Sequence, residues 1–539
     1  MKTIYYNGVV YTGDLPLVQA FIVENGYFVY TGDSESAKAL AGAEDVCVDL
    51  QGKFVCSGFI DSHMHMLGFG KMLQEARLDR HTESLEEMLS YLKEFEERKE
   101  KKGIWIYGRG WNQDYFTDVK RMPNRYDLDK ISLDRPVCIV RACGHCLVVN
   151  SKALEILGIC ENTPQPEGGC IGVEDGVLDG RLYDNAMSLA YDAIPVPDKE
   201  TLKQMIISAC KGLNAYGITS CQSDDYSTYR NVPWQIINEA YKELEAEGKL
   251  TVRIYEQSNF TSVETLKEFI EAGNITGTGT ELFKIGPLKM LGDGALGART
   301  AFLTIPYADD PSTKGIPVFT KAAFEEMISY ANKMGMQTAI HTIGDACLDW
   351  VLDAYEKALR ECPREDHRHG IVHCQITRPD QLEKIAELGL HVYAQTIFLD
   401  YDTAIVEARV GKELASTSYS WKTLMEKGVS VSNGSDCPVE LPDVMAGMQC
   451  GVTRKPLAVS ETAEAYLPKQ AFSVQEILDS YTVRGAEGSF EEKKKGKIQK
   501  GMLADFVILN QNPFEVPENK IKDISINATY LNGREVYRN

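Results

Sequence analysis

The segment Gly58-Phe59-Ile60-Asp61-Ser62-His63-Met64-His65 decides the fold class. It is a mostly apolar, strand-like run that ends on two histidines. Side chains two residues apart in a strand point to the same side, so both imidazoles can reach one metal ion. An isolated His-x-His pair is weak evidence for metal binding, whereas a pair that ends an apolar strand is stronger evidence. The segment therefore predicts a buried strand with metal ligands at its carboxyl end.

Seven further strand-like runs follow this first strand (residues 59–63), and helical patterns such as residues 202–216 separate them. They are residues 218–223, 252–257, 282–290, 337–341, 370–374, 391–395 and 429–432. Alternating strands and amphipathic helices favour a parallel sheet with right-handed crossovers. Eight such repeats predict an α/β fold, the (β/α)8 TIM barrel.

Both ends of the chain are rich in short strand-like runs with tight turns. Near the start these are residues 3–6, 9–11, 20–24, 27–30 and 46–50, and near the end residues 496–498, 504–509, 524–530 and 535–537. We expect one small β-sandwich built from residues 1–57 and 485–539. Residues 58–484 would then form the barrel domain.

The connection between the first two barrel strands, about residues 66–199, is far longer than a normal loop. It contains strand-like residues 104–107 and 137–141 and a helical pattern over residues 85–99. We therefore expect a large inserted subdomain on the catalytic face, where barrel loops build the pocket.

The charge balance restricts the classes of partner. The 539-residue chain carries a net charge of −21, which argues against nucleic acid or an anionic membrane. Residues 1–8 do not resemble a signal peptide, and no apolar stretch approaches the roughly 20 residues that span a bilayer. We expect a soluble, cytoplasmic protein, and the oligomeric state, a homodimer included, is left open.

Four more residues with metal-site chemistry fall at the ends of later strands, in a chain with only 9 histidines. They are Lys289 on the fourth strand, His341 on the fifth, His373 on the sixth and Asp436 after the eighth. Singly, each has an ordinary explanation, such as a salt-bridged lysine, a hydrogen-bonded core histidine or a turn-capping aspartate. Together they stand where TIM-barrel enzymes place their chemistry, which favours one shared site.

This set closely resembles the two-metal form of the amidohydrolase superfamily, which has HxH on strand one, Lys on four, His on five and six, and Asp on eight. Residues 294–301, 341–345 and 435–439 look like the branch that includes N-substituted formamide deformylase. The resemblance covers nearly the whole chain. One departure is Ser57, where the family usually has proline; this changes a turn and leaves the ligands untouched.

The resemblance implies a metal-dependent amidohydrolase that hydrolyses a non-peptide, amide-type C–N bond of a small molecule by a metal-bridged hydroxide. It implies two divalent ions, with zinc the first choice for such ligands. Lys289 would carry a CO2-derived carbamate that bridges the ions. His63, His65 and Asp436 would hold one ion, and His341 and His373 the other. Asp436 would also pass a proton to the leaving amine.

Three more residues are candidate contacts to the substrate. His145 lies in a segment that resembles a family segment near the substrate, so it could stabilise an oxyanion, and a structural histidine is an equal alternative. Trp111 could line the pocket, although core packing is the more usual role. Arg299 lies in the family-like segment 294–301 and is expected to contact the substrate.

Two other functions stay open. A single-metal deaminase of a heterocycle has a similar fold, needs no Lys289, and favours a His-x-x-Glu motif after strand five; His341 is instead followed by Thr-Ile-Gly-Asp. The other hypothesis is a non-catalytic, barrel-based binding protein. Such proteins usually lose a ligand, and none is missing here.

Overall fold

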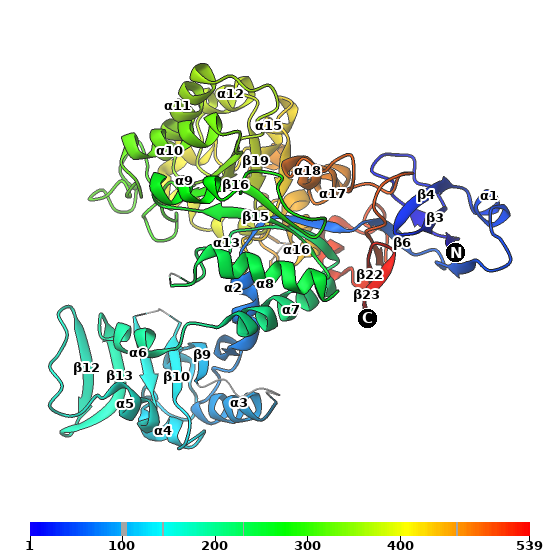
Figure 1. Cartoon of the computed structure of the whole chain (residues 1–539). Coiled ribbons are helices and arrows are strands. Elements are labelled where there is room, and N and C mark those ends of the chain that lie inside the picture. Colours follow the sequence, from blue (N-terminus) through cyan, green and yellow to red (C-terminus); the bar gives the residue numbers. More distant parts are fainter. Residues whose placement is uncertain (99–104, 143–144, 230, 460–461) are drawn as a thin grey trace. The chain divides into compact units, whose positions relative to one another are not determined.

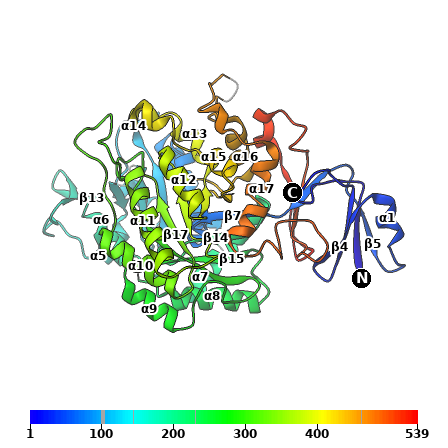
Figure 2. The same ribbon diagram turned by 90° about the horizontal axis from the view of Figure 1, so that it is seen from above.

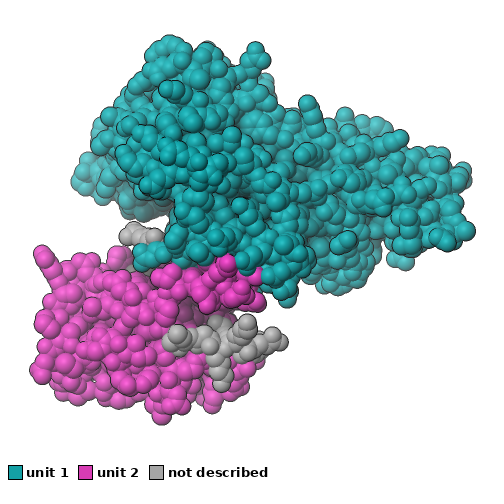
Figure 3. Space-filling model, in the orientation of Figure 1, with its two compact units in different colours: residues 1–69, 206–539 teal, residues 70–205 magenta. Residues whose placement is uncertain are grey.

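The computed structural model describes residues 1–98, 105–142, 145–229, 231–459 and 462–539. The chain divides into two compact units (Figure 3). The first contains Met1–Phe69 and Ile206–Asn539, and the second contains Gly70–Met205.

An eight-stranded parallel sheet forms the centre of the first unit (Figure 1). In spatial order its strands are β20 (Val431–Asn433), β19 (His391–Ala394), β18 (Gly370–His373), β17 (Thr338–Thr342), β16 (Phe283–Leu291), β15 (Arg253–Asn259), β14 (Ile218–Ser223) and β7 (Phe59–Met64). Beyond the two edge strands, the Asp436 N–H donates to the His63 carbonyl (2.8 Å) and the His65 N–H to the Cys437 carbonyl (2.7 Å). The order and the closing contacts confirm the predicted TIM barrel.

Helices follow the strands and surround the sheet (Figure 2). They are α7 (Lys199–Ala215), α8 (Trp234–Ala246), α9 (Val263–Glu271), α10 (Lys321–Lys333), α11 (Asp345–Glu361), α12 (Pro379–Glu387), α15 (Trp421–Glu426), α16 (Val444–Thr453), α17 (Val474–Ser480) and α18 (Val483–Gly488). Their apolar residues recur at helical spacing: α11 buries Leu348, Val351, Leu352 and Tyr355 on one face.

The close approach of β7 and β14 explains why residue 58 is a glycine. A Cβ atom on Gly58, just before β7, would lie 2.3 Å from Thr219 Oγ1 on β14. Only glycine lets β7 enter the barrel at this spacing, which sets the height of the histidines at its far end.

Both chain ends together form a β-sandwich in the same unit. One sheet has the order β4-β3-β1-β5 and the other β2-β6-β21-β22-β23. The bounds are β1 (Lys2–Tyr6), β2 (Val9–Val10), β3 (Ala20–Glu24), β4 (Tyr27–Gly32), β5 (Val46–Asp49), β6 (Phe54–Ser57), β21 (Phe506–Leu509), β22 (Ile526–Leu531) and β23 (Arg534–Arg538). Tyr5 stacks on Phe21 in the first sheet and Phe506 on Tyr530 in the second, and Tyr5 meets Phe506 edge-on at 5.2 Å.

The strand predicted over residues 496–498 was wrong. Gly496 has φ +92°, which suits a turn, and the segment has no strand partner among the described residues. Ile498 is nevertheless buried in the sandwich core. The buried side chain gave the segment its strand-like pattern.

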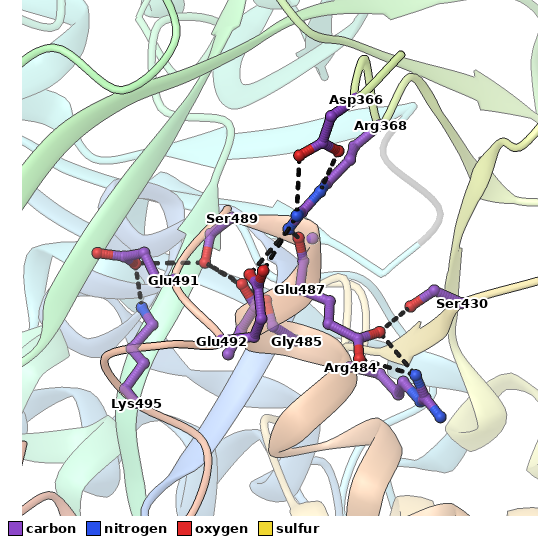
Figure 4. A network of polar contacts seen from close by, with 12 residues as sticks. Asp366, Arg368, Ser430, Arg484, Gly485, Glu487, Ser489, Glu491, Glu492 and Lys495 are labelled. Carbon is purple, nitrogen blue, oxygen red and sulfur yellow. Dashed lines mark hydrogen bonds and ion pairs between the residues drawn. The ribbon is translucent and has the colours of Figure 1, made fainter. Parts of the chain in front are cut away.

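A polar network covers the amino-terminal end of the barrel strands, opposite the histidines (Figure 4). Arg368 precedes β18 and pairs with Glu492 (2.8 Å) and Asp366 (2.7 Å). Nearby, buried Glu491 pairs with Lys495 (2.6 Å) and with Lys284 of β16. This end is closed by ion pairs, which leaves the carboxyl end as the place for chemistry.

The second unit has its own six-stranded sheet of order β12-β13-β11-β10-β9-β8. The strands are β8 (Ala76–Arg77), β9 (Ile106–Trp111), β10 (Val137–Arg141), β11 (Cys146–Val149), β12 (Gly169–Glu174) and β13 (Val177–Asp184), with helix α3 at Leu85–Arg98. Part of the strand predicted over residues 104–107 and the end of the helix predicted over 85–99 lie outside the described residues.

None of the helices in the described part of the chain is both long and apolar enough to cross a membrane.

Candidate metal centre

Six side chains with metal-binding chemistry gather at the carboxyl end of the barrel strands. His63 lies on β7, Lys289 on β16, His341 on β17 and His373 on β18. His65 follows β7 by one residue, and Asp436 follows β20 by three. The sequence-predicted ligands therefore all stand at one end of one barrel.

Two buried glutamines fix the rings of His63 and His373. Nδ1 of His63 lies 2.6 Å from Oε1 of Gln257, and Nδ1 of His373 lies 2.7 Å from Oε1 of Gln395. Each glutamine donates its own Nε2–H to a backbone carbonyl, which sets the orientation of its amide. Because an amide oxygen only accepts, both Nδ1 atoms carry the proton, and both Nε2 lone pairs are free.

Backbone carbonyls hold the other two rings. Nδ1 of His65 lies 2.8 Å from the Asp224 carbonyl, and Nε2 of His341 lies 3.2 Å from the Gly294 carbonyl. These nitrogens donate, so Nε2 of His65 and Nδ1 of His341 face inward. All four histidines thus have one nitrogen fixed by a carbonyl oxygen and one directed into the site.

The inward-facing atoms lie at metal-ligand spacing. Nε2 of His373 is 3.0 Å from Nδ1 of His341, and Oδ1 of Asp436 is 3.3 Å from Nε2 of His63 and 3.2 Å from Nε2 of His65. Two ligands of tetrahedral zinc lie about 3.3 Å apart. Facing lone pairs repel unless a cation or proton lies between them. His63, His373 and Asp436 each offer a ligand atom within 4.8 Å of the others.

The histidines of the site differ in their protonation states. Burial, together with the charge of Lys289, lowers the pKa of His341 to about 3 and also lowers the pKa of His63. Burial also opposes protonation of His65, but Asp436 and Asp224 raise its pKa to about 9. His63 and His341 are therefore neutral ligands at pH 7, and a metal ion must displace a proton from His65.

Lys289 has an unusual environment. Its side chain is fully buried, and Nζ has no hydrogen-bond partner among the described residues. The nearest carboxylate oxygen, Oδ2 of Asp224, lies 3.5 Å away. Lys289 therefore has an ion-pair partner but no hydrogen bond, and a buried ammonium without hydrogen bonds is costly, so this position suits a chemically modified lysine better than a free one.

Two buried aspartates tie the ligand-bearing loops together. Asp61 accepts from Oγ of Ser435 (2.5 Å) and from the N–H groups of Ser435 and His63 (3.1 and 3.2 Å), which joins β7 to the loop after β20. Asp293 accepts from the N–H groups of Phe302, Ile343 and Gly344 beside His341 (2.7–3.0 Å).

The other predicted substrate contacts have different surroundings. Trp111 is fully buried in the core of the second unit, and its Nε1–H donates to the Ile139 carbonyl (3.3 Å), as in the core-packing alternative. In the same unit the His145 side chain is 80% exposed and lies 3.1 Å from Asp184. Residues 143–144 beside it lie outside the described residues. Arg299 forms a two-bond ion pair with Asp309, which occupies its guanidinium.

Sequence patterns alone did not identify Gln257 and Gln395. Both end strands that the sequence identified, residues 252–257 and 391–395. A polar residue at the carboxyl end of an apolar strand was the signal that found the histidines, and it applies equally to these glutamines.

Comparison with known proteins agrees with this geometry. The profile of the Amidohydrolase family matches residues 46–537. The Bacillus subtilis (strain 168) protein YtcJ is 34% identical, over 100% of this chain and 99% of its own length. An uncharacterized metal-dependent hydrolase from Pyrococcus furiosus has 30% identity and a TM-score of 0.77, with 96% of this chain and 100% of that chain covered. N-substituted formamide deformylase of Arthrobacter pascens is 25% identical, over 96% of this chain and 94% of its length.

Proposed function

Because the chain belongs to the amidohydrolase family, we propose that it is a two-metal hydrolase of a non-peptide, amide-type C–N bond in a small molecule. His63, His65 and Asp436 would hold one ion, and His341 and His373 the other. Lys289, carboxylated on Nζ, would supply the anionic oxygens between them. Zinc is the first choice for this set of nitrogen and oxygen ligands.

One observation carries the proposal: each of the four histidines has one nitrogen fixed by a carbonyl oxygen and directs the other toward the site that also contains the buried Nζ of Lys289. A non-catalytic core has no reason to direct four imidazole nitrogens at one another. Carboxylation also suits the position of Lys289, because a carbamate keeps one N–H that can donate to Asp224, 3.5 Å away.

Bound divalent ions would supply Lewis acidity, lowering the pKa of a water molecule toward about 7 and polarising a carbonyl oxygen. The chain's own residues provide orientation and proton transfer. Gln257 and Gln395 fix the tautomers of His63 and His373. Asp436, which lies between His63 and His65, would accept a proton and return it to the leaving nitrogen.

The test is metal analysis of the full chain followed by a hydrolysis screen of N-acyl and N-formyl amines, cyclic amides and carbamates. We expect two ions per chain and cleavage of at least one amide-type bond. His341→Asn should lose the second ion and the activity. His81→Asn, which changes a histidine of the second unit paired with Glu87, should keep both.

The same experiment separates the alternatives. A deaminase would release ammonia from a heterocycle with one ion bound and would tolerate loss of Lys289. A barrel retained only for binding would need no metal, and its ligand affinity would survive a chelator.

A further inference from the structure

Three carboxyl groups lie on the segments that follow β19 and β20, beside the candidate metal centre. Asp400 and Asp402 belong to the short helix α13 (Leu399–Asp402) that follows β19, and Glu440 lies four residues after Asp436. Phe398, just before α13, stacks on the His373 ring at 5.8 Å and 17°. The helix that carries two of these acids therefore begins against a candidate metal ligand.

In the described part of the chain, the three acids lack counter-charges. Asp402 accepts from Oη of Tyr419 (2.8 Å) and Nε2 of Gln375 (3.3 Å), and Asp400 accepts from the Leu457 N–H (2.6 Å). Within the described ranges, no lysine, arginine or histidine forms an ion pair with Asp400, Asp402 or Glu440.

A buried amide points to a ligand at this place. The Gln375 side chain is directed at Asp402, and the residue is 2% exposed. Its Oε1 is buried and has no hydrogen-bond partner in the described part of the chain. A buried acceptor left unmatched costs about 1–3 kcal/mol, so a donor from outside the chain is the natural partner. We call Gln375, Asp400, Asp402 and Glu440 the acidic cluster.

The spacing of the acidic cluster excludes a compact metal site. A compact metal site needs at least three histidine, cysteine or carboxylate ligand atoms close together. In the described part of the chain, one such group has its atoms within 4.8 Å of one another: His63, His373 and Asp436. Asp400, Asp402 and Glu440 do not form such a group. Acceptors spread more widely suit an organic cation, which donates several N–H bonds over a larger volume.

Electrostatics agree with a cationic occupant. Burial raises the pKa of Asp402 to about 6. Burial and then the charges of Asp400 and Asp402 raise the pKa of Glu440. A positive group placed among these carboxyls would relieve both costs. The net charge of −21 would also attract a cation over longer distances.

We propose that the acidic cluster binds a protonated amino group of the substrate, so that the enzyme prefers amides whose amine or acyl part carries a second, cationic nitrogen. This inference rests on the proposed function, since it names the substrate class of the same site. Asp402 and Glu440 would then determine specificity.

The test compares two isosteric amides, N-(5-aminopentyl)acetamide, which is cationic, and N-hexylacetamide, which is neutral. We expect the metal-loaded full chain to favour the cationic amide at least about tenfold in kcat/KM, a difference of about 1.4 kcal/mol. Glu440→Gln should reduce this ratio about tenfold through KM, and high salt should also weaken it. Asp402→Asn should act in the same direction while its amide oxygen still accepts from Tyr419.

Glu413→Gln, an exposed acid on α14 (Val406–Ala415), is the matched control and should leave the ratio unchanged. If neither amide is cleaved, the pair is compared by calorimetry as ligands, with the same ratio expected in Kd. Equal kcat/KM or equal Kd for the two amides would overturn the cation preference. Cleavage of the neutral amide alone would do so while leaving the proposed function intact, whereas a chain that binds no metal would remove the proposed function.

Discussion

Gln257→Leu removes the acceptor that fixes the His63 ring. In the wild type, Nδ1–H of His63 donates to Oε1 of Gln257 at 2.6 Å, and His63 is only 1% exposed. Without that acceptor, the buried N–H loses its partner, or the proton moves to Nε2. An Nε2–H would donate to Asp436, whose Oδ1 lies 3.3 Å away, and would no longer offer a lone pair.

Either outcome costs about 1–3 kcal/mol, and loss of such a supporting residue typically lowers metal affinity about 10–100-fold. We therefore expect a 10–100-fold weaker affinity for zinc, measured by competition with a chromogenic chelator. The matched control is Gln222→Leu, which changes a buried glutamine of β14 that donates to the Gly485 carbonyl near the opposite end of the barrel. Equal zinc affinity in Gln257→Leu and the wild type would refute the argument that Gln257 fixes the tautomer.

Three further predictions concern the metal centre and the ion pairs at the opposite end of the barrel. Lys289→Ala should lose metal and activity, with partial recovery in formate or acetate, which can supply the missing carboxylate; full metal content without either anion would contradict this. Asp436→Asn should keep its circular dichroism spectrum and lose about 10²–10⁴-fold in kcat, the usual contribution of general acid–base catalysis; wild-type turnover would remove Asp436 from proton transfer. Glu491→Gln should lower the free energy of unfolding in urea by about 3–5 kcal/mol, because it leaves buried Lys495 and partly buried Lys284 without a counter-charge, whereas the more exposed Glu492→Gln should lose less. Burial opposes ionisation of Glu491, but Lys495 and Lys284 lower its pKa to about 2. The stability that the Glu491 carboxylate contributes is therefore present above pH 4.5 and should disappear as the pH falls toward 2. A free energy of unfolding that does not change over this range would show that Glu491 contributes nothing.

The barrel could be predicted because its strands are mostly short and are buried on both faces. Residues 218–223 were identified with the bounds that β14 has, and the other seven predictions differ from the observed strands by at most two residues at either end. A strand that is buried on both faces carries its own signal, whatever the rest of the chain does. The ligands could be found for the same reason, since each stands at or just after a strand end.

The supporting residues could not be derived in the same way. That Gln257 faces His63 depends on the register between β7 and β15, which are not adjacent in the sheet. The environment of Trp111 depends on packing within the second unit, where a sheet of both parallel and antiparallel pairs joins strands from distant segments. Sequence periodicity reports burial, but it does not report which side chains become partners.

The most direct test is the number of metal ions per chain, together with the chemical state of Lys289. The full chain is loaded with zinc in ¹³C-bicarbonate and examined by elemental analysis and ¹³C NMR, with Lys289→Met as the reference. The account predicts two zinc ions per chain and one carbamate signal that is absent from Lys289→Met. A single ion with no carbamate signal would contradict the two-metal centre and favour the single-metal deaminase.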